Sequence, residues 1–164
     1  MAMDLPRIFG RQADRDDMIA LAKGAHAEML RLCSTLEDVA DSLPRGYDRV
    51  KCLRLASELV PLVRAIHRFE EETLFPAYIE AMRMQDRDSG SIARLLSEHV
   101  EDECFAGELT EALLDLGRGG PPPNPEALGF MLRGFFESKR RHIAFEREHV
   151  VPLVSEHQAR VGTI

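Results

Sequence analysis

The 164-residue sequence lacks long apolar runs and has only three cysteines, and these absences exclude several kinds of protein. No stretch approaches the roughly 20 apolar residues that a membrane-spanning helix needs. The opening residues, MAMDLPRIFG, lack the apolar centre of a secretory signal. An odd number of widely spaced cysteines is typical of reduced thiols rather than of a disulfide framework. We therefore expect a cytoplasmic protein with no membrane association.

Positive charge is also scarce, because 21 lysines and arginines stand against 28 aspartates and glutamates, for a formal net charge of −7. A nucleic-acid-binding surface would need basic side chains gathered on one face, and the run 139–141 is too short to supply it. We expect no nucleic-acid partner. The length and the 45% share of hydrophobic residues predict one domain, residues 1–164, with a sizeable core.

No segment shows the alternating β-branched pattern that forms strands. Apolar residues instead recur every three or four positions, which is typical of helices, between breaks rich in glycine, proline and polar residues. Pro61 and Pro76 each remove a backbone donor inside the second helical stretch, so we expect kinks near both. The pattern predicts an all-α, up-down-up-down four-helix bundle with helices at about 14–41, 49–84, 92–116 and 125–158.

Histidine and glutamate stand four residues apart at three places in these helices. Residues four apart project from one face of a helix, so each pair can direct an imidazole nitrogen and a carboxylate oxygen at one point. His26, in the first helix, adds a fourth histidine. Bundle proteins that bind two iron or manganese ions use such inward-facing ligands from all four helices. The candidate metal ligands are therefore His26, His67, Glu71, His99, Glu103, His142 and Glu146.

The positions of these residues suit a single metal centre. At about 1.5 Å per residue, antiparallel helices of these lengths place the four histidines at similar distances from the connecting turns, so all four can share one layer. A weak internal repeat relates HRFEEETLFP (67–76) to HIAFEREHVVP (142–152), each with a histidine, a glutamate four residues later and a final proline. Such a repeat favours a pseudo-symmetric dinuclear centre, in which each glutamate bridges both ions and each histidine caps one.

At these residues the chain resembles the hemerythrin and HHE cation-binding family of four-helix bundles. The resemblance extends from His26 to Pro152 and rests on the lone histidine of the first helix, the two His-x-x-x-Glu motifs with trailing prolines, and the Glu98-His99 dipeptide. It implies a hemerythrin-like fold and a non-haem di-iron centre. Carried over by position, it makes the four histidines terminal ligands, and it makes Glu71 and Glu146 the bridges.

The chain departs from the family pattern on the third helix. Oxygen-carrying hemerythrins have a second histidine there, one turn after the first, whereas this chain has Glu103. An anionic ligand in place of imidazole should stabilise ferric over ferrous iron and speed autoxidation. The substitution therefore favours redox, iron-handling or sensing chemistry over reversible oxygen carriage.

A second departure lies in the first motif of the repeat. Counted back from the trailing proline, the family's histidine and glutamate would fall at Ile66 and Glu70. A rotation of the helix by one position, accommodated by Pro61, would recover the site with His67 and Glu71, and Glu70 is the alternate carboxylate. His149 follows His142 by seven residues, so we expect it beside the centre or exposed to solvent.

These observations predict a cytoplasmic non-haem di-iron protein, with two Fe ions, that binds O2 or a related small oxidant such as NO or peroxide. A chain of this size would need a protein partner, as yet unidentified, to signal, so binding or scavenging is favoured over sensing. The alternative is a structural or partner-binding helical bundle whose polar core is metal-free or binds zinc, which would need only about four ligands. An enzyme that oxidises a substrate is less favoured, because the sequence shows neither a clear access channel nor a proton-transfer group.

Overall fold

The computed structural model describes residues 15–120 and 124–161, and within these ranges every regular element is helical. The first and third helices of the bundle are uninterrupted, whereas the second and fourth each contain a five-residue π-helical segment. This confirms the predicted all-α four-helix bundle. The elements are α2 (Arg15–Ser42), α3 (Arg49–Phe69), η1 (Glu70–Leu74), α4 (Phe75–Arg83), α5 (Ser91–Arg118), α6 (Pro125–Phe145), η2 (Glu146–Val150) and α7 (Val151–Val161).

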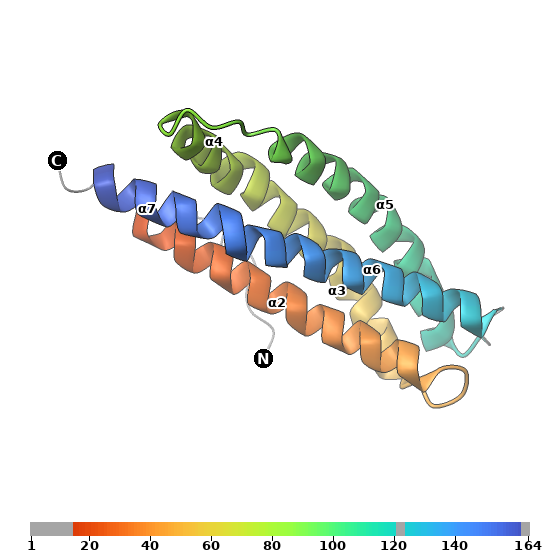
Figure 1. The fold of residues 1–164 in the computed structure, drawn as a ribbon. Coiled ribbons are helices and arrows are strands. Elements are labelled where there is room, and N and C mark those ends of the chain that lie inside the picture. The colour runs from red at the N-terminus through yellow and green to blue at the C-terminus, as the bar shows by residue number, and fades with distance from the viewer. Residues whose placement is uncertain (1–14, 121–123, 162–164) are drawn as a thin grey trace.

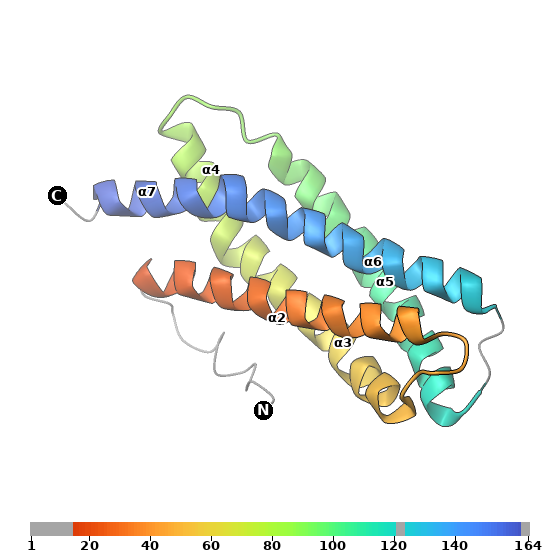
Figure 2. The ribbon, with the colours of Figure 1, turned by 60° about the horizontal axis from the view of Figure 1, so that its bottom comes forward.

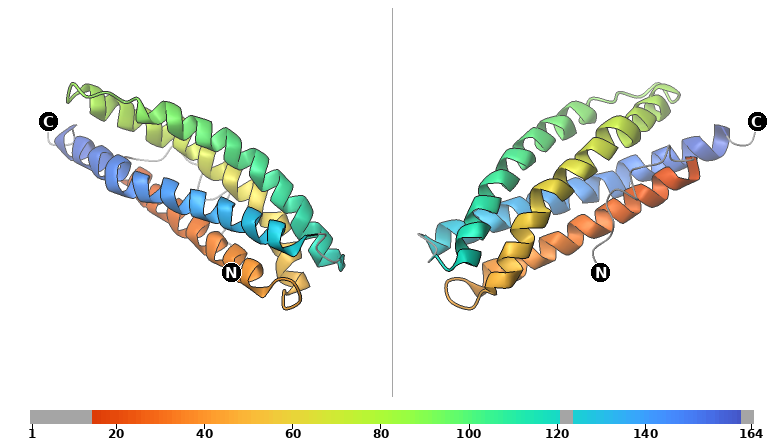
Figure 3. Two further views of the ribbon diagram at one scale, coloured as in Figure 1. Left: turned by 45° about the vertical axis from the view of Figure 1, so that its right-hand side comes forward. Right: turned by 180° about the vertical axis from the view of Figure 1, so that it is seen from behind.

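The helices run up, down, up and down (Figure 1). The connection after α2, the end of α5 and the start of α6 lie at one end of the bundle, and the connection between α4 and α5 lies at the other end, on the same side as the end of α7 (Figure 2). The closest neighbours are α3 with α5 and α2 with α6, and the views in Figure 3 show both pairs side by side. Among the described residues, no helix is both long and apolar enough to cross a membrane.

Local sequence signals explain where the helices begin and end. Asp48 caps α3, because its side chain accepts hydrogen bonds from the backbone N–H groups of Val50 and Lys51. Asn124 caps α6 in the same way, and the proline that follows it occupies the first helical turn. Helix α5 ends at Gly119, whose φ of 93° lies in the left-handed region that glycine adopts without strain.

The two π-helical segments share one hydrogen-bond pattern. In each, a backbone N–H donates five residues back, from Phe75 to Glu70 and from Val151 to Glu146. A proline comes next in both helices, and it can neither donate a backbone hydrogen bond nor tolerate a carbonyl packed against its ring. The wider π turn accommodates the proline without ending the helix. The kink predicted near Pro76 thus coincides with a π segment, whereas Pro61 lies inside an unbroken α3.

Two apolar clusters fill the bundle, one toward each end. The larger joins α2, α3, α5 and α6 around residues such as Leu36, Leu59 and Leu113. The smaller joins α4, α7 and the start of α5 around Phe75, Leu95 and neighbouring residues. A layer of buried polar side chains separates the clusters along every helix of the bundle. The fold therefore places these polar groups in an environment with little access to water.

Candidate metal centre

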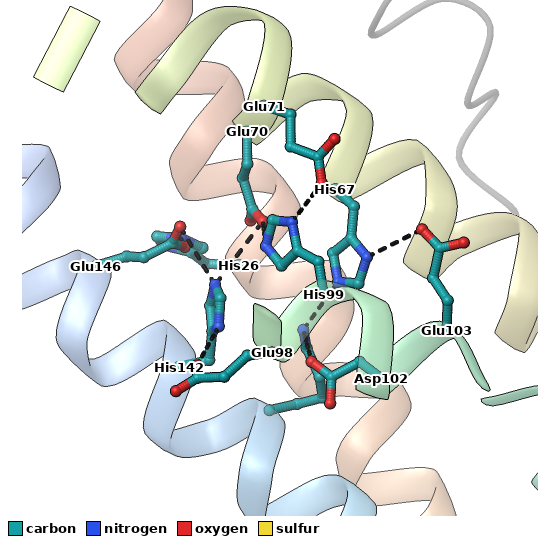
Figure 4. Close-up of polar contacts among 11 residues, drawn as sticks. His26, His67, Glu70, Glu71, Glu98, His99, Asp102, Glu103, His142 and Glu146 are labelled. Carbon is teal, nitrogen blue, oxygen red and sulfur yellow. Dashed lines mark hydrogen bonds and ion pairs between the residues drawn. The ribbon is translucent and has the colours of Figure 1, made fainter. Parts of the chain in front are cut away.

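Six histidine and glutamate side chains meet in this polar layer, and all four helices of the bundle contribute (Figure 4). Each is at most 3% exposed. In helix order they are His26 on α2, His67 on α3, Glu70 on η1, His99 on α5, His142 on α6 and Glu146 on η2.

The two buried carboxylates each face more than one imidazole. Glu146 Oε2 lies 2.7 Å from His26 Nε2, and Glu146 Oε1 lies 3.5 Å from His142 Nε2. Glu70 Oε2 lies 3.0 Å from His99 Nε2 and 3.9 Å from His142 Nε2. Two triads of groups that could bind a cation overlap here, with ligand atoms within 4.8 Å of one another: His67, Glu70 and His99, and His26, Glu70 and Glu146. Glu70 belongs to both triads.

Several inner atoms of this cluster have no hydrogen-bond partner. Among the described residues, the buried side-chain atoms without one include Glu70 Oε2, His99 Nε2, His142 Nε2 and Glu146 Oε1. An unsatisfied buried polar atom costs about 1–3 kcal/mol, so four of them in one place destabilise the bundle unless something binds them. Imidazole nitrogens and carboxylate oxygens are the donors that Fe, Mn and Zn accept. The residues present therefore fit a metal cation.

The outer nitrogens of three imidazoles are held by carboxylates from a neighbouring helix (Figure 4). Because an ionised carboxylate can only accept, each imidazole Nδ1–H donates, and in the neutral ring the inner Nε2 keeps its lone pair for a metal ion. Such outer contacts orient metal-binding histidines and raise their basicity. The contacts are His99 Nδ1 to Glu71 at 2.8 Å, His142 Nδ1 to Glu98 at 3.0 Å and His67 Nδ1 to Glu103 at 3.3 Å.

The structure thus divides the residues that the sequence pattern suggested. The four histidines and Glu146 lie together in the layer, and Glu70, the alternate carboxylate, occupies the inner position. The side chains of Glu71 and Glu103 are 44% and 35% exposed and contact outer nitrogens instead. Consecutive helical residues point about 100° apart, so Glu70 and Glu71 cannot both face inward. His149 is outside the cluster, with 57% of its side chain exposed.

Three further residues that lie against the histidine cluster were not expected from the sequence pattern. Glu98 contacts the outer nitrogen of His142, as described above. Lys139 and Asp102 form a buried ion pair, with Lys139 Nζ 2.7 Å from Asp102 Oδ2 and 3.1 Å from His67 Nε2. A signal for the pair did exist, because Asp102 follows His99 by three residues and Lys139 precedes His142 by three, so each shares a helix face with a histidine.

The surroundings shift the pKa values of the two inner carboxylates in opposite directions. Burial and the neighbouring Glu146 carboxylate raise the pKa of Glu70. Burial also opposes ionisation of Glu146, but the adjacent imidazoles of His142 and His26 outweigh it and lower the pKa of Glu146. Burial and the Lys139 charge lower the pKa of His67, so its imidazole is neutral at pH 7, the form that binds metal.

A sequence model of the hemerythrin HHE cation-binding domain matches residues 17–154. The chain belongs to the hemerythrin HHE cation-binding family. The matched range includes all six buried histidines and glutamates of the polar layer. The family and the fold therefore agree on a hemerythrin-like bundle whose buried histidines and glutamates could hold a metal cation. Comparisons with curated proteins and with solved structures found no significant match.

Proposed function

We propose that this hemerythrin HHE domain is a non-haem di-iron protein that binds O2 or a related small oxidant, such as NO or peroxide. One ion would be held by His26, His142 and Glu146, the other by His67 and His99, and Glu70 would serve both. The observation that carries this proposal is the pair of overlapping ligand triads that share Glu70. Four ligands would be enough for a structural zinc site, and this layer holds six.

Iron bound there would supply redox electrons and open coordination positions for a small oxidant. The protein's own residues set the conditions for that chemistry. The outer glutamates fix the rings of His67, His99 and His142. The ring of Phe75 stacks on His99 at a centroid distance of 5.5 Å, and the apolar clusters on either side exclude water from the layer.

The chemistry we favour is redox, iron handling or sensing, rather than reversible oxygen carriage. The family's second histidine of the third helix is replaced by Glu103, which donates no imidazole nitrogen to the centre and instead contacts His67 Nδ1 at 3.3 Å. A carboxylate on this nitrogen makes the imidazole a stronger donor, and stronger donors favour ferric iron. We place the protein in the cytoplasm, because its cysteines, Cys33, Cys52 and Cys104, are free thiols, as a reducing compartment requires.

Metal analysis and an absorption spectrum test this proposal. The protein is purified without chelators, and its spectrum is recorded before reduction with dithionite, after it, and after return to air. We expect about two iron ions per chain, with near-ultraviolet oxo-ferric bands that bleach on reduction and return in air. A colourless protein that remains fully helical and contains zinc or no metal would contradict the proposal and favour a structural bundle.

A further inference from the structure

One inner nitrogen of the centre faces a cation instead of a carboxylate. Lys139 Nζ lies 3.1 Å from His67 Nε2 and donates to Asp102 Oδ2 at 2.7 Å. All three side chains are buried, Lys139 to 2% exposure and Asp102 to 4%. A fully buried lysine is rare and is found where its charge is paired, so this arrangement is specific rather than incidental.

The Lys139 ammonium group is hydrogen-bonded to the lone pair of His67 Nε2, which a metal ion would need. An ammonium group can only donate, so His67 Nε2 accepts from Lys139 while His67 Nδ1–H donates to Glu103. The inner nitrogens of His26, His99 and His142 face carboxylate oxygens instead. His67 is therefore the one histidine of the layer whose inner nitrogen already contacts a positive charge.

The His67 ring has little freedom to avoid this contact by turning. It stacks on the His99 ring with centroids 3.8 Å apart and planes 5° apart, and Glu103 holds its outer edge. For a second cation to bind His67, the Lys139 ammonium must withdraw. That movement breaks its contact with His67, and it is confined to positions that keep Asp102 within reach, because a buried charge that loses its partner is strongly destabilising.

From this geometry we propose that Lys139 and Asp102 make the metal centre fill in sequence. The first cation binds at His26, His142 and Glu146, and the second binds at His67 and His99 only when Lys139 releases His67. This inference rests on the proposed dinuclear function and deepens it. The two positions then differ in affinity even though the ligand types on the two sides of Glu70 are similar, and Lys139 determines how many metal ions the centre holds.

Titration of the metal-free protein with Fe²⁺ under anaerobic conditions, followed by calorimetry, tests the proposal. For the unaltered chain we expect two binding steps, the second at least about tenfold weaker than the first, where tenfold corresponds to about 1.4 kcal/mol. In Lys139→Met, which keeps an unbranched side chain and removes the charge, we expect the second step to tighten about tenfold and the first to stay nearly unchanged. The matched control is Arg141→Met, which removes an exposed positive charge from the same helix and should leave both steps unchanged.

A second variant and a second measurement keep the test decisive if Lys139→Met leaves Asp102 unpaired and the bundle unfolds. The double variant Lys139→Met/Asp102→Asn removes both charges and should show the same tightening. In the unaltered chain, nitrogen NMR during Zn²⁺ addition should show the Nε2 signals of His26 and His142 shifting at the first equivalent, and that of His67 only at the second.

Three outcomes would overturn the sequence of filling. They are two steps of equal affinity in the unaltered chain, a folded variant whose second step is unchanged, or a His67 signal that shifts at the first equivalent. If the chain binds two Fe²⁺ ions with equal affinity, or if the folded variant shows an unchanged second step, the proposed function stands and only the sequence of filling is wrong. If the chain binds no metal ion at all, both the proposed function and the sequence of filling are wrong.

Discussion

The two proline-terminated halves of the internal repeat resemble each other in backbone and differ in what their histidines face. In both, a glutamate begins a π segment and a proline follows that segment by two residues, Pro76 after η1 and Pro152 after η2. Counted back from the proline, both glutamates lie six residues away, but His67 precedes Glu70 by three residues whereas His142 precedes Glu146 by four.

The difference shows that the carboxylate, rather than the histidine, keeps its place relative to the π segment and the proline. Ile66 occupies the position that corresponds to His142, and it is buried among apolar residues. His67 is displaced by one residue, or about 100° around the helix, and its inner nitrogen meets Lys139. His142 instead faces both inner carboxylates. In our proposal the second half of the repeat therefore binds a cation readily, whereas in the first half a cation must compete with the Lys139 ammonium group.

The largest expected effect comes from removing the histidine of either half. His142→Ala should lose most bound iron, because His142 contacts both carboxylates and belongs to the position we expect to fill first. His67→Ala should lose only the second ion and keep about one per chain. Metal content after reconstitution with Fe²⁺ measures both, with circular dichroism to confirm that each variant is helical.

The matched control for this pair is His149→Ala, because His149 is exposed and lies outside the cluster, and it should bind as much iron as the unaltered chain. Equal losses in His142→Ala and His67→Ala would show that the two halves are equivalent and would contradict the comparison.

A smaller effect distinguishes the two adjacent carboxylates of the first half. Glu70→Gln should weaken both binding steps, because Glu70 lies in both ligand triads and is buried. Glu71→Gln should weaken only the second step, by about tenfold, because Glu71 contacts the outer nitrogen of His99 and is half exposed. Calorimetric titration with Fe²⁺ separates the steps. If Glu71→Gln abolished metal binding and Glu70→Gln did not, Glu71 would be the bridging residue.

Much of the bundle and of its histidine layer could be predicted from the sequence. Apolar periodicity and strong breaks such as Asn124-Pro125 determine where helices form, and both are local properties of the chain. The common height of the four histidines follows from helix length alone. Helix positions and the height of a residue along its helix can both be predicted from residue spacing along the chain.

The choice between Glu70 and Glu71 depends on a single helical position, and the sequence left it open. A His-x-x-x-Glu pattern favours Glu71, but the π segment that begins at Glu70 sets the actual rotation. The role of Glu98 depends on His142 in a different helix, which spacing within α5 cannot reveal. Lysine is rarely buried, and only the contact with Asp102 makes the burial of Lys139 understandable.

The smallest expected effect comes from the outer carboxylates that hold the two repeat histidines. Glu98 and Glu103 are nearly equal in exposure, at 33% and 35%, so Glu98→Gln and Glu103→Gln form a matched pair. Loss of such a contact typically costs 10–100-fold in metal affinity, and we expect the lower end of about tenfold here because solvent reaches these partly exposed carboxylates and can replace them.

The two substitutions should act on different binding steps. Glu98 lies 3.0 Å from His142 Nδ1, so Glu98→Gln should weaken the first step. Glu103 lies 3.3 Å from His67 Nδ1 and also pairs with Arg64 at 3.2 Å, so Glu103→Gln should weaken the second step, and by less. Calorimetric titration with Fe²⁺ shows which binding step loses affinity in each variant. A change in the first step on substituting Glu103 would mean that His67 binds the tighter ion, and the order of the two halves would have to be reversed.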